Sequence, residues 1–152
     1  MKTKIGFGSG HVYNDIVANA GAGYGLLFFT SVVGIRNAHA GMIFLIGNIV
    51  DAIAVTAFGF LADLDFSCSI YHYYGKFKAW HLMGAFFLTI SYPLTFLPPF
   101  GIENEFSKTV YYTGIFVLLN LGYAITAIAH NSIILKLATC ESHQVGLSSV
   151  KT

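Results

Sequence analysis

The feature that most constrains this chain is a series of four apolar stretches, each long enough to cross a lipid bilayer as a helix. Crossing takes about 20 largely apolar residues in a helix. Each stretch is apolar on all faces and too long for a strand or a buried helix of a soluble domain. The four stretches predict an all-α membrane protein with transmembrane helices at about residues 12–35, 40–63, 79–100 and 109–135.

Composition argues in the same direction. Charged residues make up 10% of the chain and hydrophobic residues 55%, whereas roughly 25% of a soluble domain is charged. The net charge of +1 gives no reason to expect a nucleic-acid partner. Cys68 and Cys140 form no CxxC pair, so neither a metal site nor a cofactor is expected. No HExxH motif and no nucleophile–base arrangement is present, so we do not expect an enzyme.

The positions of lysine and arginine predict the orientation in the membrane, because cytoplasmic loops carry an excess of both. An even number of helices places both termini and the loop 64–78 on one side. The opposite side holds Arg36 and Lys108. We therefore predict cytoplasmic termini and a cytoplasmic loop 64–78, on the side that holds Lys2, Lys4, Lys76, Lys78, Lys136 and Lys151.

One carboxylate stands inside the second stretch, which reads GNIVDAIAVTAFGFLAD from Gly47. Asp51 lies twelve residues before Asp63, about 18 Å along a helix axis. A charge at that depth costs about 2.5–3.5 kcal/mol on insertion scales, so such residues usually face a hydrated cavity, an ion or a substrate. Asn48 shares its helix face. We favour a solute or proton pathway over the alternative, an Asp satisfied by neighbouring hydroxyls and amides.

Three further polar residues are weaker candidates for the same pathway. Asn14 and Asp15 lie near the cytoplasmic start of the first helix, where an Asp also stabilises a helix N-terminus. His130 in the fourth helix could titrate near physiological pH. A histidine near a membrane surface is more often an interfacial or hydrogen-bonded residue, and that alternative stays open.

The loop 64–78 concentrates charge between the second and third helices. Asp63 closes the second helix, and Gly75, Lys76 and Lys78 open the third. Opposite charges across a short turn could form a latch between two conformations. On spacing alone, plain positive-inside topology with a helix cap is the simpler interpretation, and we prefer it at this point.

Several stretches resemble the major facilitator superfamily, in particular its glycoside-pentoside-hexuronide:cation symporter branch. They are the mid-helix Asp followed by GFLAD, the segment YGKFKAW and the opening GHVYNDIVANA. The segments YGKFKAWHLMG and AITAIAHNSIILKLATCESHQVGLSSVK are similar to the group of major facilitator superfamily domain-containing protein 12. The animal members of that group are lysosomal and melanosomal proteins needed for cysteine import.

The resemblance assigns roles residue by residue. It implies that Asp15 and Asp51 line the cation or substrate cavity. It also implies that a gating loop contains five residues of this chain, which raises the latch above the simpler interpretation. These residues are Gly59, Asp63, Gly75, Lys76 and Lys78.

The chain departs from the branch at two positions. Val55 stands where sodium-coupled members carry a second carboxylate, and Ala127 lies about where they carry an acidic residue in the fourth helix. A single carboxylate beside Asn48 is a poor sodium cage, so proton coupling or facilitated transport is expected instead.

The function expected from these observations is secondary active or facilitative transport of a small polar organic solute, cysteine by resemblance, across a lysosomal or related membrane. Carriers of the superfamily have about twelve helices in two halves, so we interpret the chain as part of the N-terminal half: a fragment, a truncated gene model or an isoform, unable to transport alone. The alternatives are a sugar:cation symporter and a non-transporting tetraspan scaffold. The expected partners are the solute, a coupling proton and the lipid bilayer.

Overall fold

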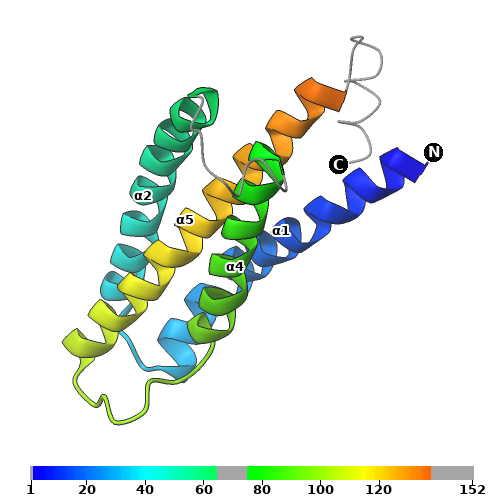
Figure 1. Cartoon of the computed structure of the whole chain (residues 1–152). Coiled ribbons are helices and arrows are strands. Elements are labelled where there is room, and N and C mark those ends of the chain that lie inside the picture. Colours follow the sequence, from blue (N-terminus) through cyan, green and yellow to red (C-terminus); the bar gives the residue numbers. More distant parts are fainter. Residues whose placement is uncertain (1, 65–74, 138–152) are drawn as a thin grey trace.

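The computed structural model describes residues 2–64 and 75–137 and is a bundle of long helices (Figure 1). None of the described residues lies in a strand, so the predicted all-α class is confirmed. The elements in chain order are α1 (Lys2–Leu27), the short π-helical segment η1 (Phe28–Val32), α2 (Asn37–Asp63), α4 (Lys76–Thr95) and α5 (Glu105–Leu137).

The helix bounds differ from the sequence expectation at both ends of the bundle. α1 begins at Lys2, ten residues before the start that was expected for the first membrane span. α4 ends at Thr95 rather than near residue 100, with Pro98 and Pro99 following within four residues. Proline has no backbone N–H and restricts the residue before it, so the helix stops short of the pair.

Two helices in the described part of the chain are long and apolar enough to cross a membrane, where four were expected. They are Asn37–Ala62 of α2 and Glu105–Ile133 of α5. The apolar stretch around α1 is divided between α1 and η1, which leaves α1 itself short of apolar residues. α4 includes Lys78, His81 and Pro93, which lower its hydropathy.

α5 is the central helix and packs against α4, α2 and α1 (Figure 1). Between α4 and α5 the two backbones touch, because Gly84 and Gly122 face each other. A Cβ atom on Gly84 would overlap Thr126 Oγ1 and lie 2.9 Å from the Gly122 carbonyl oxygen. Glycine pairs of this kind let helices approach closely where lipid supplies no hydrophobic driving force.

The bundle has two ends that later sections refer to. The Arg36 end contains the joints 33–36 and 96–104, and the Lys76 end contains the last residues of α2 and the first residues of α4. An aromatic core that includes Phe29, Phe44, Tyr112 and Phe116 fills the bundle toward the Arg36 end, with ring centroids 4.8–6.3 Å apart.

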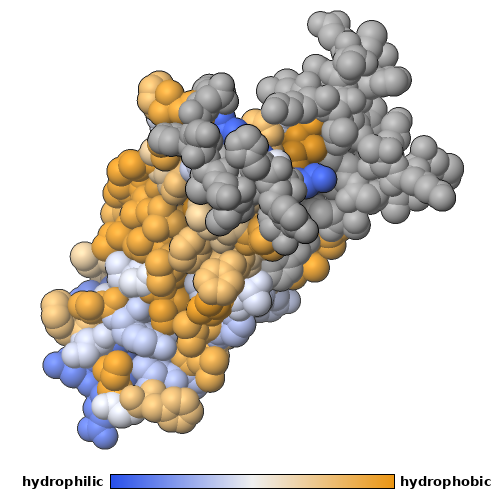
Figure 2. All heavy atoms as spheres, viewed as in Figure 1, coloured by the Kyte–Doolittle hydropathy of each residue, from blue (hydrophilic) through white to orange (hydrophobic). Residues whose placement is uncertain are grey.

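Large apolar side chains also point outward. Figure 2 shows hydrophobic residues over much of the visible face, with hydrophilic residues gathered at the Arg36 end. On α2 alone, Leu45, Ile53 and Phe60 are each about 60% exposed or more. Exposed apolar area on this scale does not persist in water, so the outer face of the bundle is suited to lipid.

Candidate functional site

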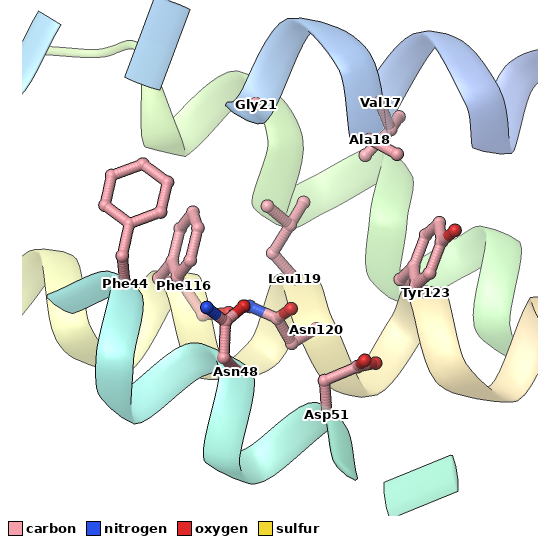
Figure 3. A pocket seen from close by; sticks show the side chains of 10 residues that line it. All are labelled: Val17, Ala18, Gly21, Phe44, Asn48, Asp51, Phe116, Leu119, Asn120 and Tyr123. Carbon is pink, nitrogen blue, oxygen red and sulfur yellow. The ribbon is translucent and has the colours of Figure 1, made fainter. Parts of the chain in front are cut away.

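A cavity of about 220 Å³ lies between α1, α2 and α5 (Figure 3). Two of its polar side chains, Asn48 and Asp51, are residues that the sequence pointed to. Its lining residues are Val17, Ala18, Gly21, Phe44, Asn48, Asp51, Phe116, Leu119, Asn120 and Tyr123.

Helical periodicity brings these residues together. Phe44, Asn48 and Asp51 follow one another at intervals of four and three, which places them on one face of α2. The four lining residues of α5 lie within eight positions, at spacings of three, one and three, which places them on the facing surface. The three residues from α1 are all small or branched, and they close the third side without filling the space.

Asp51 is the most unusual group in the cavity. Its side chain points into the hollow (Figure 3). The Oδ1 atom is buried, yet it accepts no hydrogen bond from the residues that the structure describes. A buried carboxylate oxygen without a partner is costly and is a feature of sites that receive an ion, a proton or a ligand.

The cavity has two chemically different ends. Phe44 and Phe116 stand at the end nearer the Arg36 joint, with ring centroids 4.8 Å apart. Asp51 and Tyr123 stand at the other end (Figure 3). The amide of Asn120 lies between them and donates from Nδ2 to the Phe116 carbonyl oxygen at 2.8 Å, which fixes its orientation. The cavity therefore offers aromatic surface at one end and hydrogen-bonding groups at the other.

Some of the residues that the sequence predicted for this pathway line the cavity, and others lie outside it. Asn48 and Asp51 line the cavity together. Asp15 is half-buried on α1 and lies just before the cavity, but is not among the lining residues. The side chain of Asn14 lies outside the described part. His130 is buried on α5, seven residues beyond Tyr123, which is about 10 Å further along the axis.

Three residues near these sites are absent from the sequence predictions. Asn120 and Tyr123 line the cavity, and His81 on α4 faces His130 with ring centroids 6.0 Å apart. The spacing of Asn120 and Tyr123 on one helix face is a signal that sequence carries. That spacing alone does not show that the two residues face the cavity, because this depends on the packing of α2 against α5.

The structure describes the two ends of the predicted gating loop, at the end of α2 and at the start of α4. Gly75 precedes α4 with a φ of 83°, a conformation that favours glycine. The Lys76 ammonium donates a hydrogen bond to the Leu64 carbonyl oxygen at 2.5 Å, so it joins the start of α4 to the end of α2. Lys78 is exposed, and Gly59 has open space around it. Residues 65–74 and the side chain of Asp63 lie outside the described part.

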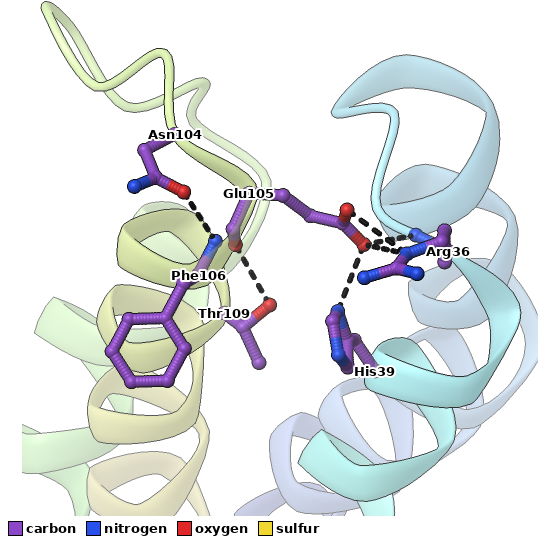
Figure 4. Close-up of polar contacts among 6 residues, drawn as sticks. All are labelled: Arg36, His39, Asn104, Glu105, Phe106 and Thr109. Atoms are coloured by element: carbon purple, nitrogen blue, oxygen red, sulfur yellow. Dashed lines mark hydrogen bonds and ion pairs between the residues drawn. The ribbon is translucent and has the colours of Figure 1, made fainter.

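A polar cluster at the Arg36 end joins the α1–α2 joint to the start of α5 (Figure 4). Glu105 accepts hydrogen bonds from the Arg36 guanidinium at 2.9 and 3.0 Å and from the Arg36 backbone N–H at 3.1 Å. His39 Nδ1 lies 2.8 Å from the same carboxylate. Lys108 also donates to the Val33 carbonyl oxygen at 3.1 Å. These contacts hold two joints that are about 70 residues apart in sequence.

The lining of the cavity is suited to recognition of a polar solute. The described residues contain no group of three histidine, cysteine or acidic side chains that could hold a metal ion. One carboxylate, two amides and a phenol can bind an ammonium group or a proton and hydrogen-bond a polar solute. The aromatic rings can pack against its apolar part.

Comparisons with known proteins identify a family of transport proteins. A model of the MFS/sugar transport protein family matches residues 6–152. The chain is 32% identical to the human major facilitator superfamily domain-containing protein 12 over 99% of this chain and 32% of that protein. It is also 32% identical to the inner membrane symporter YicJ of Escherichia coli, over 86% of this chain and 27% of that protein.

The chain spans about a third of the length of the curated relatives it matches. The uncharacterized symporter YnaJ of Bacillus subtilis is 28% identical over 99% of this chain. No solved structure matches the chain significantly.

Proposed function

Because the chain belongs to the MFS/sugar transport protein family, we propose that it forms part of the solute pathway of a secondary transporter for a small polar organic molecule. The family membership and the long apolar helices together make it an integral membrane protein. The proposal adds that α1, continued by η1, and α4 cross the membrane as well. The 20 residues of α4 give a length of about 30 Å, which is the thickness of the hydrocarbon core.

One observation carries the proposal: Asp51, in the middle of an apolar helix, points a buried carboxylate oxygen into a cavity, and that oxygen has no hydrogen-bond partner among the described residues. Its position in a membrane helix would be unfavourable without an occupant or water beside it. Asn48 and Asn120 add hydrogen-bonding groups for the same occupant.

We further propose that a proton, not sodium, is the coupling ion. Sodium and similar hard cations take several oxygen ligands, and Asp51 supplies the one carboxylate among the cavity's lining residues. Protonation would remove the charge of Asp51 and change which state of the carrier is favoured. A sugar:cation symporter is the second candidate, supported by the likeness to the symporter YicJ.

The proposal takes cysteine as the solute and a lysosomal or related organelle as the compartment, with both termini in the cytoplasm. The first two rest on the resemblance to the major facilitator superfamily domain-containing protein 12 group. The cavity is chemically compatible, because a carboxylate can bind the ammonium of an amino acid and amides can bind its carboxylate.

The test is uptake of labelled cysteine and labelled melibiose by proteoliposomes that contain the full-length protein, measured across a pH series. The Asp51→Asn variant should lose most uptake and its dependence on pH, because the amide cannot exchange a proton. Glu103→Gln is the matched control, since Glu103 is an exposed carboxylate outside the cavity. Uptake and pH dependence that survive Asp51→Asn unchanged would contradict the proposal, and uptake of melibiose alone would favour the sugar symporter.

A further inference from the structure

The two ends of the cavity raise the question of what limits the size of its occupant. The carboxylate end is formed by Asp51, which binds favourably only to polar or positively charged groups. The aromatic end is formed by Phe44 and Phe116, whose positions decide how much room an apolar part has.

Gly47 lies directly before Asn48 on α2, and the side chains of Phe116 and Asn120 pack against it. A Cβ atom on Gly47 would overlap Phe116 Cδ1, lie 2.7 Å from Phe116 Cε1 and lie 2.8 Å from Asn120 Nδ2. Separations this short do not occur in folded proteins, so a side chain at this position would force both groups to move. The other glycines within α2 that could be compared, Gly41 and Gly59, have nothing within 4 Å of the same position.

Phe116 has little room to retreat from such a side chain except into the cavity. Its ring packs 6.3 Å from the ring of Phe29, which is completely buried, and 4.8 Å from the ring of Phe44. Phe44 in turn lies against Gly25 of α1, where a Cβ atom would be 3.0 Å from its Cζ. The open space beside Phe116 and Asn120 is the cavity that both of them line.

We propose that Gly47 is a specificity-determining residue: by leaving room for Phe116 and Asn120 against α2, it sets the size of the apolar end of the solute that the cavity accepts. This inference rests on the proposed function, because it treats the cavity as the solute site. Gly47 itself touches no solute and acts through the positions of the two side chains that pack on it.

The first test measures cavity size without any transported solute. The full-length protein carries Asn48→Cys in a background whose native cysteines are serine. It is labelled with two cationic thiol reagents, aminoethyl methanethiosulfonate and its bulkier trimethylammonium-ethyl analogue. Gly47→Ala should slow the bulkier reagent roughly tenfold or more relative to the smaller one, the scale of discrimination that small differences in a packed pocket produce. Gly41→Ala, on the same helix, should leave the ratio of the two rates unchanged.

A second pair of variants keeps the test decisive if Gly47→Ala alone does not fold. Phe116→Ala removes the ring that the new methyl group would displace. Phe116→Ala and Gly47→Ala/Phe116→Ala should therefore label with the same ratio of rates, and that ratio should favour the bulkier reagent more than in the parent. The proposal is wrong if Gly47→Ala slows both reagents equally or matches Gly41→Ala. It is also wrong if the double variant still excludes the bulkier reagent.

The uptake assay then connects cavity size to selectivity. Homocysteine is one methylene longer than cysteine, so Gly47→Ala should raise the preference for cysteine over homocysteine by roughly tenfold. An unchanged preference would overturn the selectivity role. If neither solute is taken up even by the parent protein, while the labelling ratio still responds to Gly47→Ala, the proposed function fails and the size-setting role of Gly47 stands.

Discussion

At the scale of single residues, the hydroxyl side chains inside the described helices differ from Asp51 in where they find a hydrogen-bond partner. Most of the threonines and serines donate to the carbonyl four residues earlier, as Thr95 does to Ser91 at 2.9 Å and Thr126 does to Gly122 at 2.9 Å. Such hydroxyl groups are hydrogen-bonded within their own helix, so they need no other partner inside the membrane. Asp51 cannot do so, because a carboxylate accepts hydrogen bonds and the carbonyls of its helix do not donate them. Asp51 therefore needs a donor from outside its own helix, and its Oδ1 atom has none among the described residues.

Tyr112 gives a residue-scale prediction about stability. Its ring is fully buried, and its hydroxyl donates to the Leu97 carbonyl oxygen at 2.8 Å, which ties α5 to the segment after α4. Tyr112→Phe should lower the free energy of unfolding by about 0.5–1.5 kcal/mol, because it leaves that carbonyl without its partner. Thermal unfolding of the detergent-solubilised protein measures the change. Tyr111→Phe is the neighbouring control, and an equal loss in both variants would show that the bond to Leu97 is not the cause.

At the scale of elements, glycine decides which helices touch. The contact between α4 and α5 is backbone to backbone at Gly84 and Gly122, while the contact between α2 and α5 is made by side chains that pack on Gly47. A sequence rich in glycine and apolar residues suggests close packing in general. It does not say which glycine meets which helix, because glycines such as Gly114 lie in open surroundings in the same bundle.

Gly84 therefore gives an element-scale prediction. Gly84→Ala places a methyl group against the backbone N–H of Thr126 and the carbonyl of Gly122, neither of which can rotate away. The variant should lose about 1–3 kcal/mol of stability, the usual cost of overpacking. Gly114→Ala on α5 should be neutral or slightly stabilising, since alanine is favoured over glycine in helices by about 1 kcal/mol. Thermal unfolding of both variants checks this, and a stable Gly84→Ala protein would contradict the close contact.

At the scale of the whole molecule, contacts at both ends hold the bundle together. Lys76 joins α4 to the end of α2, and the cluster of Arg36, His39 and Glu105 joins the α1–α2 joint to α5. The cavity lies between these two ends. α1, α2 and α5 can then keep their relative positions around Asp51 while the exposed apolar faces meet lipid or other protein segments.

The four-helix crossing gives a prediction at this scale. If α4 crosses the membrane, a cysteine at the exposed Glu103 and one at the exposed Lys78 must face opposite sides. A membrane-impermeant maleimide added to sealed organelles or sealed vesicles should label one and not the other, and both after permeabilisation. Ala38→Cys, at the same end as Glu103, should follow Glu103→Cys. Labelling of both Glu103→Cys and Lys78→Cys from one side would show that α4 does not span.

The sequence by itself determined that the chain is helical, that its helices are too apolar for water, and that Asp51 and Asn48 share a face. Composition and the 3.6-residue period are local properties, and they need no knowledge of neighbouring helices. Only the tertiary structure decided that α5 lies at the centre, that Asn120 and Tyr123 face Asp51, and that Arg36 pairs with Glu105 across 69 positions. The physical reason is that helices in lipid associate by shape and hydrogen bonding at particular side chains, and no periodic pattern records which faces meet.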